Sequence, residues 1–187
     1  LRRHPGRVRT VTLDGVAPPG MKISLDVWTT RELALDALFE RCRATPACTK
    51  AMPDPGATLD EIARDLVAGG REIEFTDPAT GEARRAPASV DVVIGLLQPL
   101  LYAPETVSLI PALLERARQG DLAPLLASSG AFTGDLLRQM NVPLHYSVTC
   151  AEDVPRITPE SRDAALAGRR SRRLARMTLG ICDVWPK

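Results

Sequence analysis

The chain has 187 residues, of which 44% are hydrophobic and 25% are charged, and its formal net charge is +1. A charge this close to zero gives no overall field that would attract nucleic acid or an anionic membrane. No apolar run reaches the roughly 18–20 residues that a membrane span needs. Aromatic residues make up only 4%, so the core must be aliphatic, and its supply of Leu and Ala favours helix over sheet.

The first element is a predicted strand in RVRTVTLDGVAPP, residues 7–19. Its β-branched run includes Val8 and Val11, and it closes on the turn pair Asp14-Gly15 with two prolines behind it. A short apolar run followed at once by turn residues is typical of a buried parallel strand that leads into a loop.

Helices follow this strand. Residues 29–44 carry leucines at helical spacing, with Thr29 or Thr30 as the N-cap and Pro46 beyond the end. The next helix is predicted over 58–70, where Thr58 and Glu61 have the spacing of a capping box and Gly69-Gly70 supplies the stop.

A β-hairpin is predicted over 71–87, because apolar residues alternate with acids there and DPATGE has the composition of a turn. Two apolar helices are predicted over 89–101 and 105–119, and Pro111 should kink the second. The remaining predicted elements are helices over 121–128, 133–140 and 159–178 and a strand over 144–149. This order predicts a helical insertion between pieces of a mixed sheet.

The four cysteines allow two interpretations. Cys42 and Cys48 are close in sequence, whereas Cys150 and Cys182 are far apart. Without a CxxC spacing and a matching histidine pair, a zinc site is disfavoured. Two disulfides, Cys42–Cys48 and Cys150–Cys182, would suit a secreted or periplasmic protein, and four buried thiols would suit a cytosolic one.

No catalytic apparatus is evident within the chain. A catalytic triad needs a histidine beside an activated serine, but His4 and His145 are the only histidines and no G-x-S-x-G turn is present. Ser128 and Ser129 follow a helix rather than a strand. The arginine run GRRSRRLAR lacks interleaved aromatic residues, which favours a solvated helix face over a nucleic-acid site.

The stretch HYSVTCAEDVP, residues 145–155, places the adjacent acids Glu152 and Asp153 just after Cys150. Two neighbouring carboxylates in a loop are usually solvated. If a disulfide joins Cys150 to Cys182, however, the loop is stiff, and a stiff loop holds a carboxylate against a cationic ligand without a new ordering cost.

Four segments in this order resemble secreted α/β-hydrolases of the tripeptidyl aminopeptidase and proline iminopeptidase type. LRRHPGRVRTVTLDGVAPP resembles the stretch after the nucleophile turn and the core strand that follows it. RELALDALFERCRATPACTKAMPD resembles the first cap helix with its short C-x5-C element. HYSVTCAED resembles a later strand and loop of the family, and ICDVWPK resembles the end of the cap. About residues 70–140 resemble the family only as generic helical cap.

The resemblance implies an α/β-hydrolase fragment that is mostly helical cap, with one core strand and a small β-hairpin. Residues 1–20 would belong to the hydrolase core and residues 21–187 to the cap (lid). It also implies that both cysteine pairs are disulfides and that the protein is secreted or periplasmic. The parent protein would be a serine aminopeptidase without metal or organic cofactor, its triad outside this chain, so we expect the chain to be an inactive piece of a longer protein.

The resemblance also suggests site residues. In such aminopeptidases acids of the cap hold the positively charged α-amine of the substrate, and Glu152 is the first candidate here, with Asp153 second. Asp14 and Gly15 follow the core strand, where α/β sheets bind ligands, and would shape the pocket floor; plain turn chemistry is the alternative. The expected partners are a peptide with a free N-terminal amine and the rest of the hydrolase core, with no nucleic acid and no membrane.

Two other functions remain open from the sequence. The chain is alternatively the lid of a non-peptidase hydrolase, such as an esterase or epoxide hydrolase, which predicts an apolar pocket without an inward carboxylate. A third possibility is a stand-alone helical module that binds a peptide, which an exposed apolar patch would favour. The unpaired strand over 8–16 argues against the third, because it would leave a bare edge.

Overall fold

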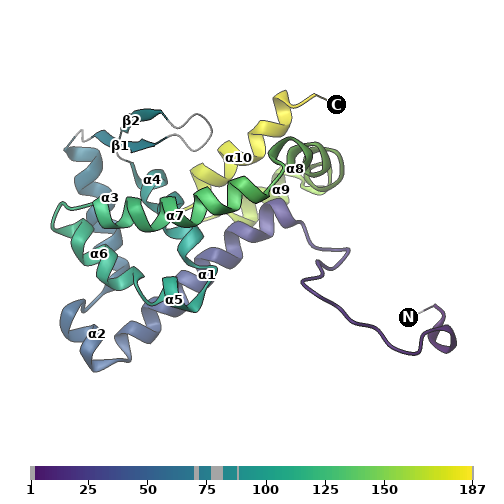
Figure 1. Cartoon of the computed structure of the whole chain (residues 1–187), viewed down its shortest axis with the longest axis horizontal. Coiled ribbons are helices and arrows are strands. Elements are labelled where there is room, and N and C mark those ends of the chain that lie inside the picture. The colour runs from purple at the N-terminus through teal and green to yellow at the C-terminus, as the bar shows by residue number, and fades with distance from the viewer. Residues whose placement is uncertain (1–2, 70–71, 77–81, 88, 187) are drawn as a thin grey trace.

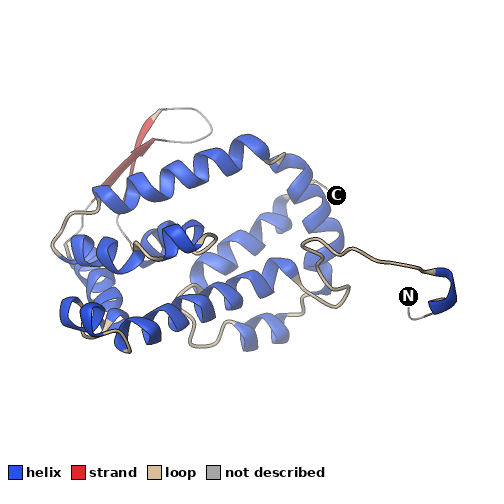
Figure 2. Ribbon diagram, turned by 60° about the horizontal axis from the view of Figure 1, so that its bottom comes forward, coloured by secondary structure: helices blue, strands red, loops and turns tan. Residues whose placement is uncertain are grey.

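The computed structural model describes residues 3–69, 72–76, 82–87 and 89–186, and the regular structure in them is mostly helical (Figures 1 and 2). Ten α-helices, two strands and three short 3₁₀ or π segments occur in these residues. In chain order they are η1 (Pro5–Arg7), α1 (Ile23–Arg43), α2 (Pro46–Ala51), α3 (Pro55–Ala68), β1 (Glu72–Thr76), β2 (Ala83–Pro87), α4 (Val90–Leu100), α5 (Pro104–Val107), α6 (Ile110–Arg118), α7 (Ala123–Gln139), α8 (Val142–Val148), η2 (Thr149–Asp153), η3 (Val154–Arg156), α9 (Pro159–Ala165) and α10 (Arg172–Val184).

Helix α1 begins at Ile23, six residues before the predicted start, so Thr29 and Thr30 are not its N-cap. Lys22, at the N-cap position, provides no side-chain cap. The carboxylate of Asp153 takes that role instead, because it accepts hydrogen bonds from the backbone N–H groups of Ile23 at 3.2 Å and Ser24 at 2.6 Å. A cap from 130 positions away leaves no local signal in the sequence.

The start of α3 also differs from the prediction. Asp54 is the N-cap and accepts hydrogen bonds from the backbone N–H groups of Gly56 and Ala57, with Pro55 in the first turn. Asp followed by Pro is a strong start signal, and it lies upstream of the predicted capping box. Thr58 instead donates its hydroxyl to the carbonyl of Asp54 at 2.9 Å.

The hairpin is confirmed. Strands β1 and β2 pair antiparallel from Glu72 opposite Pro87 to Thr76 opposite Ala83. Of the predicted turn DPATGE, residues 77–81 lie outside the described residues. Ile73 of this small sheet packs into the core, at 4% exposure.

Two predicted helix boundaries in the middle of the chain are wrong. The helix over 105–119 is two helices, α5 and α6, and Pro111 sits in the first turn of α6 instead of kinking an interior turn. The two helices over 121–140 are a single helix, α7, that runs through Gly130. An internal glycine costs only about 1 kcal/mol, and packing of α7 along α4 compensates for it.

The strand predicted over 144–149 is wrong, because these residues are helical. Asn141 caps α8 by accepting the backbone N–H of Leu144 at 3.0 Å, and Pro143 lies in the first turn. The helix then widens into the π turn η2. The helix predicted over 159–178 is divided into α9 and α10 at Gly168, whose φ of 68° is a left-handed conformation.

The strand predicted over 7–19, which includes the core strand assigned to 8–16, is not formed in this structure. A parallel strand needs neighbours to satisfy its backbone groups, and these residues have none here. The segment runs away from the helical body (Figure 1). Leu13 and Val16 are 70% and 59% exposed. The two-domain division at residue 20 stays a prediction.

Two apolar clusters hold the helices together. The larger one joins α1, α3, α4, α6 and the start of α7 and is built mainly from leucine and isoleucine, as the low aromatic content predicted. The smaller one joins the first half of α1 to α9 and α10 through Leu25, Trp28, Leu166, Ala175 and Leu179. Among the described residues, no helix is both long enough and apolar enough to cross a membrane.

Candidate functional site

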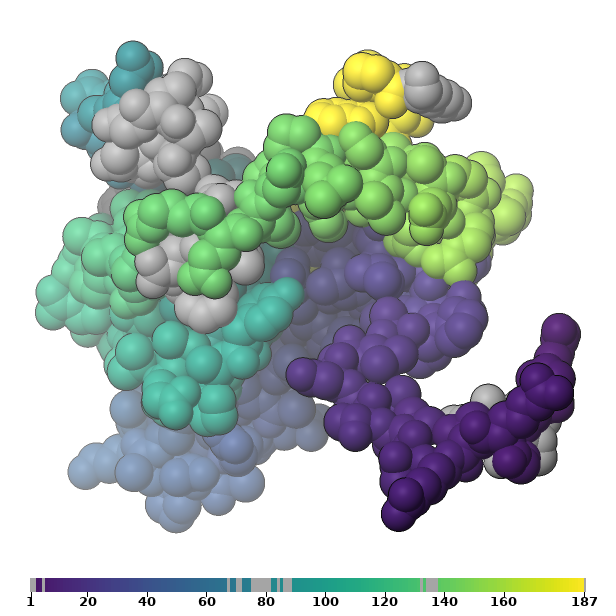
Figure 3. Space-filling model, turned by 45° about the vertical axis from the view of Figure 1, so that its right-hand side comes forward, coloured from purple at the N-terminus to yellow at the C-terminus, as the bar shows by residue number. Residues whose placement is uncertain are grey.

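An open cleft of about 970 Å³ lies where the start of α1, the end of α7 and one face of α8–η2 meet. Figure 3 shows the surface hollowed between α1, in purple, and the green segment of α7 and α8. Ile23, Leu144 and Val148 form its apolar wall and are 48%, 60% and 48% exposed. The cleft therefore offers an accessible apolar surface to a ligand or another domain.

The polar side of the cleft comes from one face of α8–η2. His145, Thr149 and Glu152 all line it, because residues three or four apart lie on the same side of a helix. The π turn continues this face. It directs Cys150 toward α10, and it brings Asp153, at the edge of the cleft, against the start of α1. The stretch that the sequence singled out is therefore a helical wall, not a strand and loop.

Asp153 lies at the base of the cleft and is 7% exposed. In addition to the start of α1, it binds Arg156 at 2.6 Å. Burial is the largest single influence and favours the neutral acid, but the hydrogen bonds from Ser24 and the charge of Arg156 outweigh it, so the pKa of Asp153 lies below its ordinary value. Its lone pairs are thus occupied by structural partners.

Arg156 fixes the chain that leads into α1. Its two terminal nitrogens donate to the carbonyl oxygens of Pro19 at 2.8 Å and Met21 at 2.9 Å, and its Nε donates to the carbonyl of Glu152 at 3.0 Å. Arg156 was not among the site residues predicted from the sequence. The spacing Asp153-x-x-Arg156, which allows a pair on one helical turn, was the available signal.

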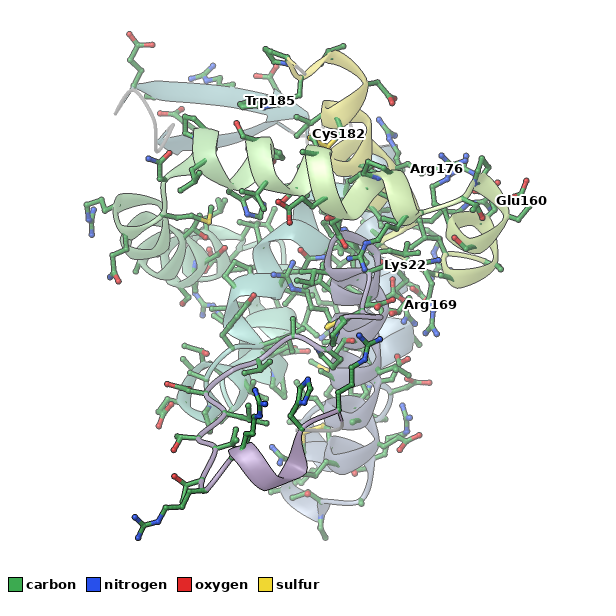
Figure 4. The ribbon with its side chains drawn as sticks, turned by 90° about the vertical axis from the view of Figure 1, so that its right-hand side faces the viewer. Lys22, Glu160, Arg169, Arg176, Cys182 and Trp185 are labelled. Carbon is green, nitrogen blue, oxygen red and sulfur yellow. A yellow bond between two sulfur atoms is a disulfide. The ribbon has the colours of Figure 1, made fainter. Side chains whose placement is uncertain are left out.

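Both disulfides that the resemblance implied are present. Cys42–Cys48 links α1 to α2, and Cys150–Cys182 links η2 to α10. Trp185, just after α10, donates its indole N–H to Ser147 of α8 at 3.3 Å. Figure 4 shows Cys182 and Trp185 on one side of the α8–η2 helix and Lys22 on the other. This helix is therefore attached both to the chain that enters the helical body and to the chain that leaves it.

Glu152 is exposed and lines the cleft beside Asp153. No basic side chain that the structure describes lies within 4.0 Å of its carboxylate, whereas Asp153 is neutralised by Arg156. The structure thus brings the two predicted acids together and gives them different surroundings. Glu152 carries an uncompensated negative charge at an open cleft, and Asp153 holds the backbone.

Asp14 and Gly15 do not join this site. Both are exposed, and they form a bend in the segment that extends from the helical body (Figure 1). Gly15 has a φ of 57°, a left-handed conformation that favours glycine. The observed geometry is that of a simple turn, and the prediction that they shape a pocket floor has no counterpart among the residues of the cleft.

The arginine run connects helices. Arg170 lies 3.1 Å from Asp60 and 3.5 Å from Asp36, and Arg173 lies 3.1 Å from Asp91. These contacts tie the start of α10 to α3, α1 and α4, which leaves less charge for an anionic partner. Among the described residues, no group of three or more His, Cys, Asp or Glu side chains is placed to hold a metal ion.

Comparisons of this chain with protein-family profiles, with curated proteins and with solved structures gave no match. The two disulfides fit an extracellular protein, because such bonds persist in oxidising compartments.

Proposed function

We propose that the chain is the lid and substrate-binding portion of a secreted or periplasmic serine hydrolase of the α/β-hydrolase fold that removes residues from peptide N-termini. In this proposal Glu152 holds the α-amine of the peptide, and the nucleophile, acid and histidine come from outside residues 1–187. The sequence resemblance supplies the family, and the arrangement of the helical body supports the role of a lid.

The observation that carries the proposal is the position of the α8–η2 helix. It lines the cleft, it is bound through Asp153 and Arg156 to the chain that enters α1, and it is bound through Cys150 to the last turn of α10 and through Ser147 to Trp185 just after α10. A lid inserted into a core domain needs its two connections close together, and its ligand-facing surface must lie at that same end. Here the cleft, the chain that enters α1 and the end of α10 all meet at the α8–η2 helix.

The chemistry of Glu152 supports the amine-binding role. An α-amine with a pKa near 8 is positive at neutral pH. A carboxylate in an open cleft, with no ion-pair partner among the residues that the structure describes, is a suitable receptor for it. The disulfide and the buried Asp153 stiffen the helix that carries Glu152, so binding would cost little ordering entropy. A π turn at this point agrees with the frequent occurrence of such turns at functional sites.

The test is Glu152→Gln in the full-length protein, assayed on a peptide with a free amine and on its N-acetylated form. Loss of a charge-assisted hydrogen bond, worth about 1.5–3 kcal/mol, should raise KM for the free-amine peptide about 10- to 100-fold and leave the acetylated peptide unchanged. Glu160→Gln, an exposed acid of α9 outside the cleft, is the matched control.

Two other results would refute the proposal in different ways. Ester or epoxide turnover that Glu152→Gln does not alter would make the chain the lid of a non-peptidase hydrolase. Binding of peptides without turnover by the full-length protein would make it a stand-alone binding module, a function that the exposed Ile23, Leu144 and Val148 would also serve.

A further inference from the structure

A second polar cluster lies along α1, apart from the residues that line the cleft. Arg31 donates from one terminal nitrogen to Gln98 Oε1 at 2.9 Å and from the other to the hydroxyl of Tyr102 at 3.0 Å. Its guanidinium carbon lies 5.8 Å from the ring centre of Trp28 and 5.4 Å from that of Tyr102. Two aromatic rings and an amide thus fix the orientation of one cation.

The guanidinium of Arg31 has spare hydrogen-bonding capacity. It carries five N–H donors, and Gln98 and Tyr102 take one bond each from it. Its Nε is the single buried side-chain nitrogen or oxygen without a hydrogen-bond partner among the residues that the structure describes. Because this Nε is sealed from solvent, the donors left for a ligand are the second N–H groups of the two terminal nitrogens.

The positive charge of Arg31 also lacks a counter-charge. No carboxylate of a side chain that the structure describes lies within 4.0 Å of it, whereas Arg156, Arg162 and Arg170 each have an acid at that distance. Trp28 and Gln98 are 6% and 8% exposed, so water is largely excluded from one side of the cluster. A desolvated cation of this kind favours an anionic partner.

We infer that Arg31, with Gln98, Tyr102 and Trp28 around it, binds the carboxylate of a peptide ligand. A planar carboxylate matches the fork of a guanidinium, and a single cation suits a monoanion better than a phosphate. Arg31 lies eight residues after Ile23 of the cleft, about 12 Å along the helix axis. One extended peptide of a few residues spans such a length. The carboxylate is either an acidic side chain or a C-terminus.

The experiment uses the 187-residue chain and the fluorescence of Trp28. Because the chain has two tryptophans, Trp185→Phe leaves Trp28 as the reporter. Three peptides are titrated: acetyl-Ala-Ala-Glu-amide, acetyl-Ala-Ala-Ala with a free C-terminus, and acetyl-Ala-Ala-Gln-amide. All three lack a free amine, so their binding does not depend on Glu152, and a failure here leaves the proposed function untouched.

At least one carboxylate peptide should bind about tenfold or more tightly than the Gln-amide peptide, and the tighter of the two identifies the source of the carboxylate. Arg31→Gln should weaken that binding about 10- to 100-fold. The matched control Arg41→Gln removes the same charge from an exposed position of α1 and should leave binding unchanged.

Equal binding of all three peptides by the parent protein would overturn the inference without the use of any Arg31 variant. Unchanged binding by a folded Arg31→Gln protein would also overturn it. If that variant fails to fold, Tyr102→Phe provides the second test, because Tyr102 is 60% exposed and its hydroxyl positions the guanidinium. The Tyr102→Phe variant should bind the carboxylate peptide about threefold or more weakly than the parent, and unchanged binding would overturn the inference.

Discussion

Replacement of Asp153 by alanine should destabilise the whole helical body without any direct effect on a ligand at Glu152. The change removes the cap of α1, worth about 0.5–2 kcal/mol, and charge-assisted hydrogen bonds worth about 1.5–3 kcal/mol. Arg156 is 43% exposed, so solvent screens part of the ion pair. We expect the free energy of unfolding in urea to fall by about 2–4 kcal/mol at pH 7.

Two further variants separate the contributions. Asp153→Asn keeps an oxygen that can cap α1 and loses the charge, so it should cost about half as much as alanine. The neighbouring exposed residue provides the matched control, because Glu152→Ala should change the free energy of unfolding by no more than about 0.5 kcal/mol. A similar loss at both positions would show that the two acids do not have the different roles described above.

The pH dependence gives an independent test. Because the pKa of Asp153 is lower in the folded protein than in the unfolded chain, its stabilising effect is present above the unfolded pKa of about 3.9. The effect is lost as the pH falls from there through the folded pKa. The difference in stability between the parent and Asp153→Asn should therefore shrink in acid. A difference that stays constant from pH 7 to pH 3 would refute the role of the charge.

The remaining predictions concern the disulfides and the core. Serine in place of both Cys150 and Cys182 should lower the free energy of unfolding by about 3–4 kcal/mol, and serine in place of both Cys42 and Cys48 by about 2–2.5 kcal/mol. The reason is that the chain-entropy model scales with loop length, and the two disulfides span 32 and 6 residues. Equal losses of the two variants in urea unfolding would contradict this model. Leu114 is fully buried, at 0% exposure, so Leu114→Ala should lower the free energy of unfolding by about 2–5 kcal/mol. A Tm unchanged from that of the parent would show that Leu114 is not packed in the core.

Local patterns in the sequence predicted much of this structure. The hairpin followed from the alternation around Ile73, because a period of two distinguishes a strand from a helix without any distant contact. Most helices followed from leucine spacing in the same way. The low aromatic content predicted an aliphatic core, and the described core is built mainly from leucine and isoleucine. The pairing of the four cysteines came from the resemblance, since spacing left it open.

The predictions failed where a segment depends on distant residues. Residues 144–149 end in Val148 and Thr149, which favour a strand. Asn141 and Pro143 favour a helix start instead, and the disulfide to α10 holds the helix in place. Residues 7–19 have the composition of a strand, yet a strand forms only against a neighbour that supplies hydrogen bonds.

The sequence by itself determined that acids would follow Cys150 and that one of them would be a candidate to hold a cation. Only the tertiary structure decided which one is available. Asp153 meets the start of α1 and Arg156, whereas Glu152 faces an open cleft. The physical reason is that adjacent residues on a helical turn point in different directions, so neighbours that are chemically alike in sequence meet different partners once the helices pack.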